Sequence, residues 1–427
     1  MSVYTQDAVV RVRPFSRQPE GDDVIIGRVE TGVFLAVPPG AVEILDYLAE
    51  GKSVGEAADL YRQKHGEVPD LSDFLQILAI KGIIEDAEAE GKQAPADRPN
   101  RQKHRPIHYH FENFPQPLAR RIFSRPVLFG CLILIAIALA AYIHDPAVMP
   151  KLSDLYVSDH RTLIWSVLVV ISYGSVVLHE LSHVIAARAI GVSSRLGFGN
   201  RLWDLVIEAD LTALWSVPKR KRYMPLLAGS LLDAVSASLC FFILYANRQH
   251  WLIIGPVLLR IIKLALLTYL TRVMWQGFLF VRTDYYYVIA TLFNCRNLLS
   301  DTEAFLRNQI ARIFPWVRKV DQSAIPISER RVIPIYAVVW VGGRIVALTW
   351  LFSVTIPLSR KYIVNVGHAL GNGFFANPGN FIDSLLLFAI FILPIAIGLV
   401  LWIAGLIRGA IQNITFPRKA VALPQRS

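Results

Sequence analysis

The chain has 427 residues, of which 54% are hydrophobic and 18% charged, with a formal net charge of +11 and a mean hydropathy of +0.42. This composition is too apolar for an ordinary soluble enzyme and favours a membrane protein with a soluble appendage. In such a protein the excess of Lys and Arg belongs in cytoplasmic loops, so no nucleic-acid partner is predicted. Three cysteines, Cys131, Cys240 and Cys295, show neither disulfide nor metal-site spacing.

Residues 1–87 contain neither a spanning segment nor a signal peptide, which predicts a cytosolic N-terminal domain. Alternating apolar residues predict two or three short strands, the last over Val33 to Val37. Three amphipathic helices follow, the third beginning at Asp70. The order of these elements predicts a small α+β, winged-helix-like fold.

Part of this domain resembles the peptide-binding chaperone of pyrroloquinoline quinone biosynthesis and, more broadly, the RiPP recognition elements, which hold leader peptides of ribosomally made, modified peptides. The residues that carry the resemblance are Gly32 to Pro38, Ala41 to Leu45, Gly51 to Val54 and Leu78 to Ile84.

The resemblance implies that a precursor or leader peptide adds as an extra strand beside Val33, Phe34 and Leu35 and packs against the third helix. A DNA-binding winged helix is the competing interpretation. The third helix, which carries Asp70 and Asp73, is not a basic face suited to phosphates.

Residues 88–115 are polar and contain prolines, which predicts a flexible linker. A transmembrane domain is predicted over 116–410 and a cytoplasmic tail over 411–427. Basic residues cluster in segments that a six-span arrangement places on one side. This predicts a multi-pass protein of the cell inner membrane, embedded in the lipid bilayer with both termini cytoplasmic. The predicted α-helical spans are Val127 to Ile143, Leu163 to Ile190, Met224 to Leu244, Leu252 to Phe280, Ile333 to Leu358 and Leu385 to Ile407.

The second predicted span ends in a sequence with the pattern of a metal site. Positions i and i+4 of a helix share one face, so His179 and His183 can bind one metal ion, with Glu180 beside it to accept a proton from water. Ionisable groups inside a membrane span are costly and are usually functional. The alternative is a pair of histidines satisfied by polar groups inside a helix bundle.

A tetrahedral zinc site needs a third protein ligand, and Asp284 is the residue that the topology favours. The second and fourth predicted spans both run inward, so Asp284 reaches a depth similar to that of the histidines. Asp233 and Asp210 are the substitutes, and an ion pair with Arg282 is the structural alternative for Asp284.

Two further segments carry polar patterns. Residues 196–213 alternate apolar and polar positions, as expected for a hairpin that offers an edge to an extended substrate or for a plain amphipathic connector. Arg344 lies in the middle of a predicted span, where an ion pair, with Asp233 as partner, is expected.

The chain from about Pro115 onward looks like the site-2-protease family of intramembrane zinc metalloproteases, in particular its putative peptide zinc metalloprotease group. The resemblance is carried by His179 to His183, Asp210 to Trp215, Ala228 to Asp233, Asp284 to Tyr286 and Asn297-Leu298. It implies that His179, His183 and Asp284 hold Zn²⁺ and that Glu180 is the catalytic general base.

The chain departs from the family pattern near the third ligand. Tyr285 stands where the family usually has Gly, and Asp233 stands where it usually has Asn. Asp233 is also assigned to substrate binding, while it stays open, with Asp210, as a substitute for Asp284 at the metal.

The sequence as a whole predicts a zinc metalloendopeptidase that binds a precursor peptide through its N-terminal domain and removes the leader. Two alternatives stay open. One is regulated intramembrane proteolysis of a transmembrane anchor, and the other is a non-catalytic membrane receptor or exporter for a modified peptide.

Overall fold

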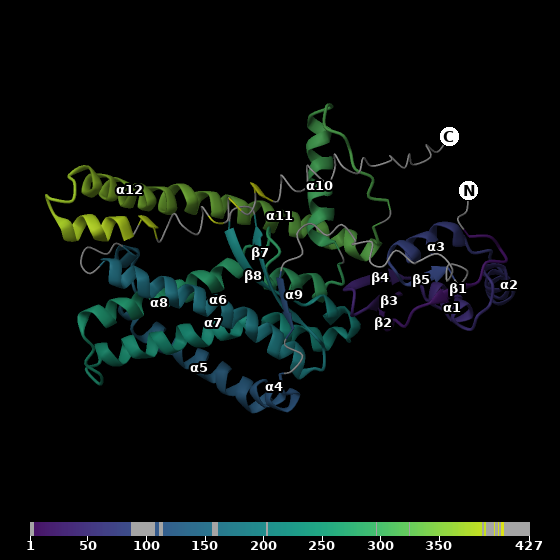
Figure 1. Ribbon diagram of the computed structural model, residues 1–427, viewed down its shortest axis with the longest axis horizontal. Coiled ribbons are helices and arrows are strands. Elements are labelled where there is room, and N and C mark those ends of the chain that lie inside the picture. The colour runs from purple at the N-terminus through teal and green to yellow at the C-terminus, as the bar shows by residue number, and fades with distance from the viewer. Residues whose placement is uncertain are drawn as a thin grey trace.

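The computed structural model describes residues 4–86, 107–110, 114–155, 161–201, 204–295, 297–323 and 325–386, with a few single positions beyond them. Most of the predicted linker, most of the sixth predicted span and the predicted tail lie outside the described residues. The described part is mostly helical and contains small antiparallel sheets (Figure 1).

The N-terminal unit packs strands and helices around one apolar core. Strands β2, β3 and β4 form an antiparallel sheet in that order, and β1 pairs with β5. Ser53 and Glu56 form a capping box at the start of α2, which ends at Gly66 with φ 76°. The elements are β1 (Val10–Val12), β2 (Ser16–Glu20), β3 (Asp23–Arg28), β4 (Val33–Val37), α1 (Pro39–Ala49), α2 (Val54–His65), α3 (Leu71–Ile80) and β5 (Ile84–Asp86).

The three predicted helices and the strand over Val33–Val37 are confirmed, and the structure adds strands that the sequence pattern does not predict. Strand β2 contains Pro19 and little apolar alternation. It lies at the edge of its sheet, where a missing backbone N–H is tolerated.

The linker prediction over 88–115 is wrong at its C-terminal end. Ile107–His110 form β6, which pairs with β7 (Arg195–Arg201), and β7 pairs with β8 (Asp204–Asp210). Helix α4 also begins at Gln116, directly after the predicted linker. The sheet has the order β6–β7–β8, so β8 is an edge strand among the described strands. The hairpin predicted within 196–213 is thereby confirmed.

Four helical segments in the described residues are long and apolar enough to cross a membrane: Gln116–His144, Leu163–Ala189, Lys219–Arg248 and Glu329–Val354. They match the first, second, third and fifth predicted spans. The fourth corresponds to α8, a helix of 21 residues with three basic side chains, which falls outside this group. The elements are α4 (Gln116–Ile122), α5 (Arg125–His144), η2 (Pro146–Val148), η3 (Leu152–Leu155), α6 (Arg161–Ala189), η4 (Thr212–Ser216), α7 (Lys219–Arg248), α8 (Pro256–Gln276), α9 (Asp284–Leu292), α10 (Leu298–Ile313), α11 (Ile327–Trp350), η5 (Leu351–Thr355) and α12 (Ile356–Gly371).

The N-terminal unit sits against one end of the helical part, with β2 and β3 on η4 (Figure 1). Arg222 Nη2 donates to Glu20 Oε2 at 2.6 Å, and the two side chains are 2% and 14% exposed. The Arg222 guanidinium also lies 4.7 Å from the centre of the Trp215 ring. Val29, in the turn after β3, packs on an apolar cluster that includes Leu214. A buried ion pair and an apolar contact therefore fix the unit beside the start of α7.

Candidate metal centre

Helix α6 presents both histidines to the interior of the bundle. His179 is 4% exposed and His183 is 1% exposed. His179 Nδ1 lies 2.8 Å from Asp233 Oδ2, and His183 Nδ1 lies 2.6 Å from the carbonyl oxygen of Pro225. Because each partner is an acceptor, each Nδ1 carries the proton and each Nε2 keeps a lone pair for a metal.

Asp284 is placed by the junction between α8 and α9. Thr283 caps α9 by accepting a hydrogen bond from Tyr286 N, and its own hydroxyl donates to the carbonyl oxygen of Gln276. The Gln276 side chain accepts a hydrogen bond from Asp284 N at 3.0 Å. Ser230 of α7 donates to Asp284 Oδ2 at 3.3 Å. The Asp284 carboxylate is thus aimed at the two histidines from a capped and buried helix start.

The ligand atoms of His179, His183 and Asp284 all lie within 4.8 Å of one another. Asp284 Oδ2 is 3.2 Å from His179 Nε2 and 3.3 Å from His183 Nε2. Atoms bound tetrahedrally to zinc at about 2.1 Å are about 3.4 Å apart. His183 Nε2 is buried and makes no hydrogen bond of suitable geometry within the described part of the chain. Two imidazoles and one carboxylate fit a divalent metal ion such as Zn²⁺.

Gly229 of α7 closes the other side of this group. A Cβ at position 229 would overlap the Nε2 atoms of both His179 and His183. Glycine is therefore the residue that leaves room between α7 and the two imidazoles.

Glu180 lies next to the first histidine and faces the hairpin. Its Oε2 accepts a hydrogen bond of 2.8 Å from Ala209 N in β8. The Glu180 carboxylate is therefore close both to the metal ligands and to any strand that would pair with β8.

The structure corrects the assignment of Asp233 to substrate binding. The Asp233 side chain is 1% exposed, and it lies behind His179 on the side away from Asp284. Its second oxygen lies 3.3 Å from Arg272 Nη2, which also donates to Ser175 Oγ at 2.6 Å. Asp233 therefore orients His179 and is itself held by Arg272.

The expected ion pair between Arg344 and Asp233 is also wrong, because α8 supplies the partner. The guanidinium of Arg344 lies 4.0 Å from the centre of the Trp340 ring. Asp210, the other substitute ligand, accepts hydrogen bonds from the backbone and hydroxyl of Thr212 and belongs to the end of the hairpin.

The residues predicted to bind a leader peptide, Val33, Phe34 and Leu35, lie in β4, away from the metal ligands. Strand β4 pairs only with β3 among the described strands. The Phe34 ring covers Gly27 of β3, where a Cβ would overlap the ring.

The sequence assigns no role at the metal centre to four residues that shape it: Gly229, Gln276, Arg272 and Ala209. Each acts through the packing of helices or strands distant in sequence, which spacing along the chain does not reveal. Comparison of the chain with protein-family models, with curated proteins and with solved structures finds no match.

Proposed function

We propose that this protein is an intramembrane zinc endopeptidase that binds a precursor peptide through its N-terminal unit and cleaves it beside the α6 histidines. The observation that carries the proposal is the grouping of His179, His183 and Asp284 around one point, with Glu180 adjacent. Two of these ligands, His179 and His183, are buried in a helix apolar enough to span a membrane, where ionisable side chains are costly unless they are used.

The chemistry is hydrolysis of a peptide bond. Zinc, when bound by the three ligands, supplies a Lewis acid that polarises the scissile carbonyl and acidifies water. Glu180 accepts one proton from the attacking water, whose oxygen adds to the carbonyl carbon. The same carboxyl returns the proton to the leaving nitrogen as the C–N bond breaks, so the products are one carboxylic acid and one amine. Asp233 holds the His179 ring in register throughout.

The β8 edge is the surface on which an extended substrate fits this chemistry. Glu180 accepts the hydrogen bond of Ala209 N in β8, so a peptide that pairs with β8 at this residue would take over that N–H and leave the Glu180 carboxylate free beside it. Backbone pairing at a sheet edge accepts many side-chain sequences.

The N-terminal unit supplies a second strand edge, that of β4, which pairs only with β3 among the described strands. Helix α3 carries two exposed apolar residues, Ile77 at 48% and Ile80 at 75%. Arg28 Nη1 donates to the carbonyl oxygen of Gly82, which ties the end of α3 to the end of β3. A leader peptide that pairs with β4 is held between these elements.

The direction of such a peptide follows from the docking of the two units. Strand β4 runs away from Gly32, which lies next to Thr212 at the end of the hairpin. A peptide antiparallel to β4 therefore leaves it at the Val33 end, facing the hairpin. Ala209 lies three positions before Thr212, which is at most about 10 Å of chain. The segment that follows the leader is thus the part delivered to Glu180.

We place the protein in the cell inner membrane with the N-terminal unit in the cytoplasm. Arg220 and Lys221 are exposed where this unit meets the start of α7, and Lys and Arg favour the cytoplasmic side of a membrane.

The test combines metal content with cleavage. Wild-type protein and the Glu180→Gln variant should each hold one zinc ion per chain by mass spectrometry, while His183→Ala and Asp284→Ala should lose it. Only the wild type should cleave a library of quenched fluorogenic peptides. Zinc bound by wild-type protein without any cleavage favours the non-catalytic receptor or exporter. Cleavage by Glu180→Gln would show that the peptidase proposal is wrong.

A further inference from the structure

Helix α10 ends in a group of exposed apolar side chains, here called the α10 tip: Ile310, Ile313, Phe314 and Trp316. These side chains are 49%, 74%, 41% and 78% exposed, respectively. The rings of Phe314 and Trp316 lie 5.0 Å apart. A contiguous apolar patch of this kind on a protein surface marks a contact with another phase or partner.

The segment after α10 folds back along the helix and holds the α10 tip in a defined shape. Asn308 Oδ1 accepts a hydrogen bond of 2.8 Å from Val320 N, and Asn308 Nδ2 donates to the carbonyl oxygen of Val320 at 2.9 Å. Gln322 Nε2 then donates to the carbonyl oxygen of Asp301 at 2.8 Å. Residues 314–320 are thereby closed back onto α10 with their apolar side chains outward.

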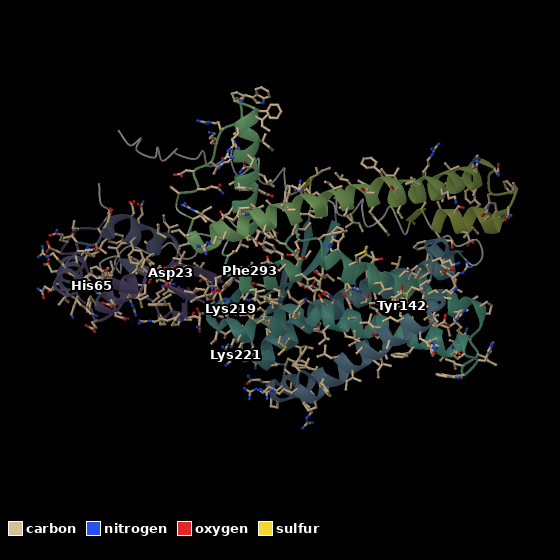
Figure 2. All side chains as sticks on the ribbon, turned by 180° about the vertical axis from the view of Figure 1, so that it is seen from behind. Asp23, His65, Tyr142, Lys219, Lys221 and Phe293 are labelled. Carbon is tan, nitrogen blue, oxygen red and sulfur yellow. The ribbon has the colours of Figure 1, made fainter. Side chains whose placement is uncertain are left out.

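The base of α10 lies at the ends of two helices that are able to span a membrane. Lys219, the first residue of α7, donates to the carbonyl oxygen of Leu292 and to Asn294 Oδ1, directly before α10. Figure 2 shows Lys219 and Phe293 together between the N-terminal unit and the long helices. After the tip, the chain enters the candidate span Glu329–Val354. Both figures show α10 standing across the long helices, with its tip projecting sideways.

The charge around the tip has one sign. Between Arg307 and Val320 the chain has four basic residues, Arg307, Arg312, Arg318 and Lys319, and no acidic one. All four are exposed. Aromatic rings combined with Lys and Arg are typical of segments that lie in the headgroup layer of a bilayer.

We infer that the α10 tip is a membrane anchor that inserts its apolar side chains into the bilayer surface on the side of the N-terminal unit, with its basic residues on anionic lipid headgroups. A helix that crosses the spans at their ends lies in the plane of this surface. The inference is independent of the peptidase proposal, since the α10 tip contributes none of the metal ligands.

The experiment uses the full chain with a fluorophore on one introduced cysteine, in a Cys131→Ala, Cys240→Ala background that keeps the buried Cys295. The test position is Ile313→Cys. A matched control is Val68→Cys in the N-terminal unit, because Val68 is 73% exposed and Ile313 is 74% exposed. Ile137→Cys in α5 is the lipid-facing control. The protein is reconstituted into phosphatidylcholine vesicles with and without phosphatidylglycerol, and nitroxide lipid and aqueous iodide are the quenchers.

In the anionic vesicles the label at 313 should be quenched by nitroxide lipid, as at 137, while the label at 68 is quenched by iodide. The variant Arg312→Glu, Lys319→Glu should reduce lipid quenching at 313 only, since each basic residue at an anionic surface contributes about fivefold to binding. Iodide quenching of the label at 313 equal to that at 68 would overturn the inference. Shielding of the label at 313 from both quenchers would also overturn it, because it would indicate a contact with protein. Lipid quenching at 313 that is unaffected by phosphatidylglycerol and by the charge reversal would overturn the role of anionic lipid.

Discussion

The substitution Gly229→Ala adds one methyl group at the point where α7 faces the metal ligands. The new Cβ would overlap His179 Nε2 and His183 Nε2, so one imidazole or the backbone of α7 has to move. Overpacking of this kind costs about 1–3 kcal/mol, against about 1 kcal/mol gained by Ala over Gly inside a helix. Folding stability should therefore change by no more than about 2 kcal/mol.

Metal affinity should respond far more strongly than stability. Changes to groups that merely orient a ligand cost about 10–100-fold in affinity, and Gly229→Ala displaces a ligand atom itself. Zinc affinity should fall by more than about 100-fold, measured by competition with a chelator of known affinity, with thermal unfolding recorded in parallel.

Gly174→Ala is the matched control for this substitution. Gly174 lies in α6, the helix that carries the histidines, and a Cβ there meets no atom within 4 Å among the described residues. It should bind zinc like the wild type. Gly229→Ala protein that binds zinc as tightly as Gly174→Ala would refute the argument that the Gly229 position is part of the metal centre.

Three further predictions concern residues around the centre and the docked units. Asp233→Asn should lower zinc affinity, measured by chelator titration, about 10–100-fold because it loosens the hold on the His179 ring. Asp210→Asn should leave zinc affinity unchanged, and equal effects of the two substitutions would contradict the orienting role of Asp233. Glu20→Ala leaves the buried guanidinium of Arg222 without its ion-pair partner, at a cost of about 3–5 kcal/mol. Hydrogen exchange over residues 16–28 should therefore rise, and it should return toward the wild-type rate when Arg222→Met is added. Burial raises the pKa of the Cys295 thiol to about 11, so about one thiol in a thousand is ionised at pH 8. Its alkylation, followed by mass spectrometry, should accelerate tenfold per pH unit up to pH 10, and a rate that levels off near pH 8 would contradict the raised pKa.

The pair of histidines could be predicted from sequence because the spacing of four residues fixes their common face on any helix. Asp284 could be predicted because the expected topology gives it a depth similar to that of the histidines, and the structure brings the three residues together. The polar side chains that hold these ligands in place could not be predicted in the same way. Whether Arg272 or Arg344 reaches Asp233 depends on the rotation of α8 and α11 about their axes, which hydropathy does not determine.

Strand β6 shows a different limit. Its residues follow a polar, proline-bearing segment, so local composition indicates a linker, whereas the strand exists through pairing with β7 about ninety residues later in the chain. The basic residues of α8 show a third limit. They weaken its hydropathy signal, yet Arg272 and Lys263 lie near Asp233 and Asp154, so a helix with poor hydropathy is satisfied by its neighbours.

The two sheet edges acquire a functional meaning only through the way the units dock. On its own, β4 is a strand edge that pairs only with β3 among the described strands, and β8 is an edge that lies beside Glu180. The ion pair between Glu20 and Arg222 is buried, and breaking it by removing one partner is costly, so it sets the orientation of the N-terminal sheet relative to α7. The helix that receives this ion pair also carries Gly229 and Asp233, which shape the metal centre. One helix therefore fixes both the place where a peptide would be held and the place where it would be cut. A leader bound in the wrong orientation would direct its downstream segment away from the hairpin.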